Sequence, residues 1–577
     1  MQQKMFMLRV EQTSKGKMEE AVSNMTSLGI GSERTGKDAG SRTRRSLLKA
    51  VGVGAAGYLL ASSDVKAASV LSSSPRNCIF EVTFYGATGD GKTIDSDSIN
   101  RAIMAAAQKG GTVYFPAGIY LCYSIRLQSN ITLELAAGAV IQAAESSTSS
   151  SVKGGFDTPE ANATYEGYMD FGHSHWHNSL IWGEELKNVS IIGPGLICGK
   201  NLSRGEGRGP VAETPGVGNK AIALKNCHNV LLRDFSILSG GHFAVLATGV
   251  DNFTIDNLKV DTNRDGIDID CCRNVRISNC SVNTPWDDAI VLKSSYTLGY
   301  IRSTEAVSIV NCYVTGGYEV GTLLDGTYKP FVKDSTIPDD DKWVRRIGRI
   351  KFGTESNGGF KNIAISNCVF ESSYGIAIES VDGALIEDVT ITNLTMRNIV
   401  VSPIFIRLGS RLRGPQGTFV GAIRRIIISN IVCSNSSSKY ASVIAGIPGH
   451  PIEDITLSSI YVQHVGGISS EAVPVQLPEM EQEYPEAAMF GITPAQGLYA
   501  RHVKGMSVSD INISSLKPDT RPLFILYDVQ DVTFIQIRSR PLVDSLTFSL
   551  DNVRDFRVAL AQSVPDTILE GITTRNL

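Results

Sequence analysis

This chain of 577 residues is poor in charge: only 19% of its side chains are acidic or basic, and the two signs nearly balance at a net charge of −4. The low charge excludes a disordered polyampholyte, and the missing basic excess excludes a protein that binds nucleic acid through a cationic surface. Beyond residue 67, no apolar run approaches the ~18 residues that a membrane-spanning helix needs. We therefore expect a soluble mature chain.

The first 67 residues are interpreted as an export signal. Arg44 and Arg45 precede an apolar run over 50–61, and Ala67 ends a sequence similar to a small-residue cleavage site. That run is too short to anchor the chain in a membrane. The paired arginines resemble a twin-arginine signal, which implies a periplasmic or secreted protein. Without the signal the chain carries 43 basic and 52 acidic side chains, a net charge of −9.

Short alternating segments recur along the chain. Those beginning at Asn229, Asn252 and Asn274 share one pattern of apolar and polar residues, and their starts are 23 and 22 residues apart. Alternation predicts strands with one buried face, and so short a unit buries a core only by stacking on its neighbours. Further copies are predicted at Asn188, Ala306, Asn362, Asp388, Asp454, Gly505, Asp531 and Asp555.

We therefore expect an all-β fold, a right-handed parallel β-helix with coils about 4.8 Å apart. Leucine-rich repeats have a similar period, but their dense leucine pattern and helical half are missing. The recurrent asparagine predicts amide hydrogen bonds to the same turn one coil away. Residues 96–109 predict one helix that caps the open end of the stack. The expected parts are a signal (1–67), a cap with the first coils (68–125) and the main β-helix (126–577).

Four of the ten cysteines occupy one position of the repeat, after an asparagine: Cys227, Cys280, Cys312 and Cys368. A free cysteine behaves as a small hydrophobic residue. Recurrence at one place therefore predicts reduced thiols that stack in the core.

Three acidic residues fall on neighbouring repeats. Asp265 is followed 22 residues later, one predicted coil, by the pair Asp287 and Asp288. Residues one coil apart lie about 5 Å apart in a β-helix. Crowded carboxylates disfavour one another's ionisation, so this cluster predicts one protonated acid and an ionised base, as glycoside hydrolysis requires. The neighbouring Asp268 and Asp270 are interpreted as structural.

These residues resemble glycoside hydrolase family 28, the polygalacturonases and rhamnogalacturonan hydrolases, over roughly residues 80–560. The resemblance rests on three motifs in the family's order, Asn263-Arg264-Asp265, Asp287-Asp288 and Arg349-Ile350-Lys351. It implies a glycosidase that cleaves galacturonate-containing pectic polysaccharide with inversion and that needs no cofactor or metal.

The resemblance also implies a role for each motif residue. Asp287 would be the general acid, while Asp265 and Asp288 would activate water on the opposite face. Arg349 and Lys351 would hold a substrate carboxylate. A further candidate for substrate contact, from its spacing alone, is His242, because it precedes Asp265 by 23 residues, about one coil.

One motif departs from the family. Gly316 stands where polygalacturonases carry a histidine, which argues against plain polygalacturonan as the substrate. Glu319 nearby is predicted either to supply a replacement polar group or to face solvent. A histidine introduced at position 316 would be expected to clash with the sugar of a rebuilt site. The long segments 326–348 and 478–499 would wall off one end of a cleft and favour exo-cleavage.

Two other functions remain open. A pectate lyase would bind Ca²⁺ through the clustered acids, and a non-catalytic adhesin-like or tailspike-like β-helix would have no pocket at Asp287. The alternation of His173, His175 and His177 around Trp176 suggests one side of a metal site, although a sugar-binding rim or an exposed strand is favoured. We expect a monomer that acts on a pectic saccharide, with no nucleic-acid or membrane partner.

Overall fold

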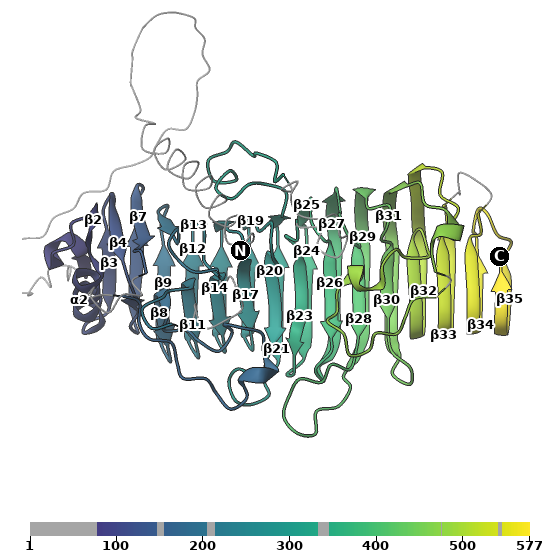
Figure 1. The fold of residues 1–577 in the computed structure, drawn as a ribbon, viewed down its shortest axis with the longest axis horizontal. Coiled ribbons are helices and arrows are strands. Elements are labelled where there is room, and N and C mark those ends of the chain that lie inside the picture. The colour runs from purple at the N-terminus through teal and green to yellow at the C-terminus, as the bar shows by residue number, and fades with distance from the viewer. Residues whose placement is uncertain (1–77, 147–154, 205–213, 333–345, 475, 540–544) are drawn as a thin grey trace, which may run out of the picture. The chain divides into compact units, whose positions relative to one another are not determined.

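The structure is a computed structural model that describes residues 78–146, 155–204, 214–332, 346–474, 476–539 and 545–577. The predicted export signal and residues 333–345 of the segment 326–348 lie outside the described residues. In the described part, parallel strands stack in chain order around one hydrophobic core (Figure 1). The fold is a parallel β-helix, as predicted.

Each coil contributes a strand to each of three parallel sheets. The first sheet consists of β5 (Ile125–Arg126), β8 (Ser179–Glu184), β11 (Lys220–Lys225), β14 (Phe243–Thr248), β17 (Asp265–Asp270), β20 (Ile290–Ser294), β23 (Ile350–Ser356), β26 (Ile376–Ser380), β28 (Ile404–Leu408) and β30 (Ser442–Ala445). The second consists of β1 (Ile79–Glu81), β3 (Gly111–Phe115), β6 (Ile131–Leu135), β9 (Lys187–Ile192), β12 (His228–Arg233), β15 (Asp251–Asp256), β18 (Arg273–Ser278), β21 (Thr304–Val310) and β24 (Phe360–Ser366).

The third sheet consists of β2 (Asp90–Ile94), β4 (Gly118–Cys122), β7 (Ala139–Ala143), β10 (Leu196–Cys198), β13 (Ser236–Leu238), β16 (Lys259–Asp261), β19 (Ser281–Asn283), β22 (Tyr313–Thr315) and β25 (Val369–Glu371). Beyond β25, long strands continue more than one sheet each: β27 (Leu385–Arg397), β29 (Ala422–Ser436), β31 (Ile452–Gly466), β32 (Leu498–Lys517), β33 (Phe524–Ile537) and β34 (Phe548–Ala559). Short 3₁₀ turns are η1 (Val82–Tyr85), η2 (Glu166–Tyr168), η4 (Ser470–Ala472) and η5 (Ala487–Phe490).

The predicted repeat is one column of paired positions in the second sheet and its continuation. Val230, Phe253 and Val275, which follow the three motif asparagines, pair with one another across β12, β15 and β18. Every other predicted copy joins this column, and two copies that we did not predict begin at Asn130 and Arg425. The first residue of each copy has a positive φ. Asn, Asp and Gly tolerate that left-handed conformation best, which explains their recurrence.

The motif asparagines also form the predicted ladder. Asn252 Nδ2 donates to Asn229 Oδ1 at 2.9 Å, and Asn274 Nδ2 donates to Asn252 Oδ1 at 2.8 Å. Asn188 and Asn130 extend the ladder toward the N-terminus. We call these five residues the asparagine ladder.

Both ends of the stack are covered. Helix α2 (Ser96–Ala107) forms within the predicted range and buries Ile99, Ala102, Ile103 and Ala106 against the first coils. At the other end β35 (Thr567–Asn576) pairs antiparallel with β34. Among the described residues, no helix is long and apolar enough to cross a membrane.

The repeated cysteines lie in the core, as predicted. Cys227, Cys280, Cys312 and Cys368 are buried free thiols in the main hydrophobic cluster. Contact with Cys280 and burial raise the pKa of Cys312 to about 12. These thiols are therefore stacked packing residues of the core.

Candidate active site

Three neighbouring strands of the first sheet bring the motif residues together. Asp265 is the first residue of β17, Asp288 lies in the turn before β20, and Arg349 immediately precedes β23. The register pairs Ile267 with Ile290, and Gly266 N donates to Asp288 O. Asp288 is therefore level with Asp265. We predicted that Asp287 would hold this position, and the coil is one residue longer than the 22 that we assumed.

The three carboxylates form one cluster, which we call the acidic trio: Asp265, Asp287 and Asp288. One oxygen of each lies within 4.8 Å of the others. Asp265 and Asp288 are buried, whereas the side chain of Asp287 is 27% exposed. Burial, together with the charges of Asp287 and Asp268, raises the pKa of Asp265 well above its usual value. Burial therefore favours the protonated form of Asp265 more than in an ordinary aspartate.

Asp288 is held in the opposite state. Burial would raise its pKa, but Arg349 and Lys351 outweigh that effect and hold the pKa at about 2. Arg349 Nε donates to Asp288 Oδ1 at 2.6 Å, and Lys351 Nζ lies 3.3 Å from Oδ2. The trio therefore contains one carboxylate that is ionised at any working pH beside one that resists ionisation.

Arg264 engages the third member of the trio. Its Nε lies 3.1 Å from Asp287 Oδ2, and its Nη2 donates to His242 Nε2 at 3.2 Å. His242 is buried against Phe243, and Phe243, rather than His242, pairs with Asp265. Burial and the charge of Arg264 lower the pKa of His242 well below its usual value. His242 therefore lies one position away from the register that we predicted, and its imidazole contacts Arg264; its contact with substrate stays a prediction.

Arg349 and Lys351 contact acidic groups and a tyrosine of the chain itself, and their predicted role in holding a substrate carboxylate stays a prediction. Arg349 Nη1 and Nη2 donate to the two carboxylate oxygens of Glu486, at 2.8 and 2.9 Å. Lys351 Nζ donates to the Tyr484 hydroxyl at 3.2 Å and lies 3.6 Å from Glu379. Glu486, Tyr484 and Glu379 were not predicted from the sequence to lie at the site. Only the length of the segment 478–499 indicated that something covers this end of the site.

Gly316 has a different neighbour from the sugar that we expected. A Cβ atom on Gly316 would lie 2.5–2.8 Å from backbone atoms of Arg346 and Ile347. A histidine here would therefore clash with the chain itself, which corrects our expectation of a clash with substrate. Glu319 is half-buried; its backbone N–H donates to the Lys329 carbonyl, and its own carbonyl accepts from Thr322. Its role as a replacement polar group stays a prediction.

A second buried network lies beneath the trio. Asp270 accepts from the backbone and the hydroxyl of Ser295 at 2.8 and 2.5 Å, which agrees with a structural role. Asp268 is fully buried with Lys293 Nζ at 3.9 Å and no hydrogen bond, and burial raises its pKa well above the usual value. Lys293 itself donates to Glu355 at 3.0 Å. Lys293 therefore lies between two buried acidic groups, Glu355 and Asp268, near the acidic trio.

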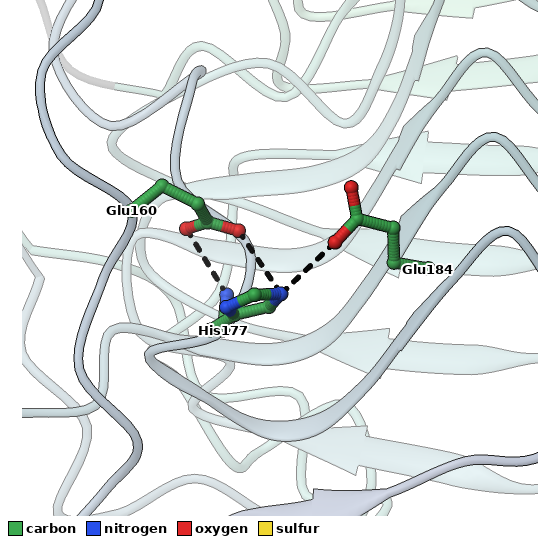
Figure 2. Close-up of side chains that lie close together, drawn as sticks. All are labelled: Glu160, His177 and Glu184. Atoms are coloured by element: carbon green, nitrogen blue, oxygen red, sulfur yellow. Dashed lines mark hydrogen bonds and ion pairs between the residues drawn. The ribbon is translucent and has the colours of Figure 1, made fainter.

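The histidine motif forms neither a strand nor an exposed rim. His173, His175 and Trp176 are buried in turns, and only His177 reaches the surface. Figure 2 shows His177 between two carboxylates; its Nε2 lies 3.1 Å from Glu184 and 3.4 Å from Glu160. These three groups have metal-ligand character. However, Lys225 Nζ lies 2.7 Å from Glu184, so one of the two carboxylates already has a cationic partner.

Comparisons with known proteins match this architecture. A family model described as rhamnogalacturonase A/epimerase, pectate lyase-like, matches residues 79–228, and one described as a right-handed beta helix region matches residues 220–393. A probable polygalacturonase of Vitis vinifera is 22% identical over 455 residues, 72% of this chain and 83% of that protein. An exo-poly-alpha-D-galacturonosidase of Dickeya chrysanthemi is 28% identical over 130 residues, 22% of this chain and 20% of that protein.

Among solved structures, a hyperthermoactive exopolygalacturonase from Thermotoga maritima is similar, with a TM-score of 0.50 at 20% identity. The match covers 67% of this chain and 87% of that chain. Strand topology, family matches and structural likeness agree on the fold: the chain is a right-handed parallel β-helix with sequence similarity to pectin-acting enzymes.

Proposed function

We propose that this protein is a glycoside hydrolase that cleaves galacturonate-containing pectic polysaccharide. The observation that carries the proposal is the acidic trio itself: three carboxylates whose nearest oxygens lie within 4.8 Å of one another, one of which, Asp288, has a pKa of about 2, while another, Asp265, has a raised pKa. Glycoside hydrolysis needs a carboxyl that gives a proton to the leaving oxygen and a carboxylate that takes one from water. The similarity to polygalacturonases supports the substrate class.

Each member of the trio has a role that fits its surroundings. Asp288, ionised between Arg349 and Lys351, is the base. Asp287, the exposed member, delivers the proton to the leaving oxygen once substrate displaces Arg264. Asp265, whose raised pKa favours the protonated carboxyl, donates a hydrogen bond that orients the attacking water. In the sequence-based assignment Asp265 was a second base, and we propose this role in its place.

We propose that the reaction inverts the anomeric carbon. Cations hold both oxygens of Asp288, and a carboxylate whose charge is shared in this way is a weak nucleophile for the covalent route. The nearest oxygens of the trio nevertheless lie within 4.8 Å of one another, closer than the ~6.5–9.5 Å between carboxyl groups in most inverting enzymes. Proton NMR of the first-formed reducing end tests this directly, since retention of configuration would refute inversion.

We infer exo-cleavage, rather than endo-cleavage, from the segment 478–499, which carries Glu486. That segment lies against the strands that follow β20 and contacts Arg349 and Lys351, which supports the exo-cleavage expected from its length. An exo-acting enzyme releases only short products from the first minute, whereas an endo-acting enzyme gives a ladder of lengths. Product analysis on polygalacturonan, rhamnogalacturonan I and short oligogalacturonides tests both the substrate and the position.

The lyase alternative is tested in the same assay. The trio has the oxygen ligands that Ca²⁺ prefers, but Arg264, Arg349 and Lys351 already neutralise it. A hydrolase should keep its activity in a chelator and form no unsaturated sugar. Loss of activity in chelator with absorbance from a new double bond would instead identify a lyase.

We also propose that the enzyme meets its substrate after twin-arginine export. The support is Arg44 and Arg45 ahead of the apolar run over 50–61. Cell fractionation tests this proposal, because replacing both arginines by lysine should leave the full-length chain in the cytoplasm.

A further inference from the structure

Glu486 places a carboxylate of the chain itself where the resemblance implied a carboxylate of the substrate. Its two oxygens face Nη1 and Nη2 of Arg349 at 2.8 and 2.9 Å, the forked geometry in which a guanidinium binds a carboxylate. The remaining nitrogen, Nε, donates to Asp288. All three nitrogens of Arg349 are therefore engaged within the chain.

Lys351 offers no spare charge either. Its Nζ contacts Asp288, Glu379 and the Tyr484 hydroxyl, and its side chain is only 2% exposed. Arg349 and Lys351 thus face the carboxylates of Asp288 and Glu486, and the Glu379 carboxyl lies 3.6 Å from Lys351 Nζ. A uronate that entered beside Arg349 would find no unmatched cation and would lie against the charge of Glu486.

The segment that carries Glu486 is fastened on both sides. Before Glu486, Arg407 donates to the carbonyls of Glu479 and Met480, and Arg501 donates to that of Pro478. After Glu486, the buried Phe490 lies beneath the guanidinium groups of Arg407 and Arg501, at 5.5 and 5.1 Å. Both arginines are themselves buried. Glu486 is therefore built into the site, because moving it would uncover two buried charges and an aromatic ring.

A cation is offered on the other side of the trio. Arg264 lies on the coil of β17, and its side chain is 34% exposed. Arg349 lies on the coil of β23, and the trio lies on the coils of β17 and β20. The site is therefore polarised along the stack. Arg264 beside β17 is partly exposed and, among the described residues, is ion-paired with Asp287 alone. Arg349 and Lys351 beside β23 are instead buried among several acidic groups.

We propose that Glu486 determines specificity: the enzyme binds an acidic sugar beside Arg264 and a sugar without a free carboxylate beside Arg349. The preferred substrate is then a polymer in which uronate alternates with neutral sugar, or in which uronates are esterified, rather than a fully acidic polygalacturonan. This inference rests on the proposed function, since it assumes that the trio cleaves the bond between these two units.

The test compares two oligosaccharides of equal length, one composed only of galacturonate and one that alternates galacturonate with a neutral sugar. The wild-type protein should favour the alternating substrate in kcat/KM. Glu486→Gln keeps the size of the side chain but removes its charge, so that preference should fall about tenfold, mainly through a lower KM for the acidic substrate. The matched control is Glu483→Gln, which removes an exposed charge three residues away and should leave the preference unchanged.

Two results would overturn the inference: equal efficiency of the wild type on both substrates, or an unchanged preference in Glu486→Gln. If Glu486→Gln does not fold, as judged by circular dichroism and melting, Glu486→Ala provides the same measurement. If the wild type cleaves neither substrate, the proposed function fails, and binding still decides the role of Glu486. Titration calorimetry should then show about tenfold tighter binding of trigalacturonate to Glu486→Gln than to the wild type or Glu483→Gln; equal affinities would refute the role.

Discussion

The asparagine ladder and the acidic trio both stack side chains from successive coils of the β-helix, but one column is stable by itself and the other needs partners. In the asparagine ladder, Asn229, Asn252 and Asn274 form an exposed column joined by hydrogen bonds of 2.8–2.9 Å. In the acidic trio, Asp265 and Asp288 are stacked in the same way, but they are buried. An amide both donates and accepts, so it bonds to copies of itself, whereas an ionised carboxylate only accepts.

The difference explains why chemistry is confined to one place in a repetitive molecule. A column of carboxylates persists only where cations or protons relieve it, and the coil of β23 supplies Arg349 and Lys351. The ladder is self-sufficient and has only a structural role. The trio depends on its partners, and that dependence creates the unequal pKa values that the proposed catalysis uses.

The largest expected effect comes from turning one acid into an amide. Asp287→Asn should lower kcat by about 10²–10⁴-fold, the usual value of a general acid, with little change in melting temperature because Asp287 is partly exposed. Asn252→Ala in the ladder is the control and should keep its activity. A variant that retains more than about a tenth of wild-type kcat would exclude Asp287 as the acid.

The second-largest effect should come from removing a cation that contacts the acidic trio. Arg349→Ala leaves Asp288 without its closest cation, which should lower the free energy of unfolding by about 3–5 kcal/mol and raise the pKa of Asp288. The acid limb of the kcat profile should therefore move to higher pH, and activity should fall equally on charged and neutral substrates. A rise of KM restricted to uronate substrates would instead restore the carboxylate-binding role that the resemblance implies.

Glu379 should make stability depend on pH. Burial raises its pKa from 4.5 to about 7 despite Lys351, so the folded state binds more protons than the unfolded state between these values. Stability is then full below pH 4.5 and falls as the pH rises to about 7, by about 3 kcal/mol. Urea unfolding should show this fall in the wild type relative to Glu379→Gln; parallel pH profiles of the two proteins would contradict it.

The smallest effect should come from placing a carboxylate in the ladder. Asn252→Asp loses the donor to Asn229 while still accepting from Asn274, which should cost about 1 kcal/mol of unfolding free energy at neutral pH. Below about pH 4 the protonated carboxyl donates again, and much of the loss should be recovered. Chemical denaturation at two pH values measures this, and a loss that does not change with pH would show that the ladder bond contributes little.

The repeat could be predicted from sequence because its turn accepts few residue types. The left-handed position holds Asn, Asp or Gly in every copy except those at Ala306 and Arg425, so its spacing is visible along the chain. The copy at Arg425 was missed because arginine is unusual in that conformation. The partner of Asp265 was assigned one residue too early, because coils differ in length by one residue and the pattern does not indicate which turn takes the extra one.

The electrostatics of the site could not be predicted in the same way. Glu486 lies 137 residues from Arg349 in the chain, and no repeat or motif marks the fold of the segment that carries it. The register of His242 was also predicted wrongly. We assumed a coil of 23 residues before Asp265, but this coil has 22, so Phe243 is the residue that pairs with Asp265. Periodicity predicts which residues share a coil, whereas burial decides which of them meet substrate.

The final strand bears on how such a chain avoids polymerising. Every coil presents the same row of backbone donors and acceptors to the next, so a parallel stack has no intrinsic length and its open end could receive a coil from another molecule. Strand β35 runs against the direction of β34, the only antiparallel pairing of strands among the described residues. Strand β35 also carries Glu570, Gly571 and Arg575 and is largely exposed, and charged residues and glycine on an edge strand disfavour pairing with another chain. The composition of this last strand therefore disfavours end-to-end fibre growth.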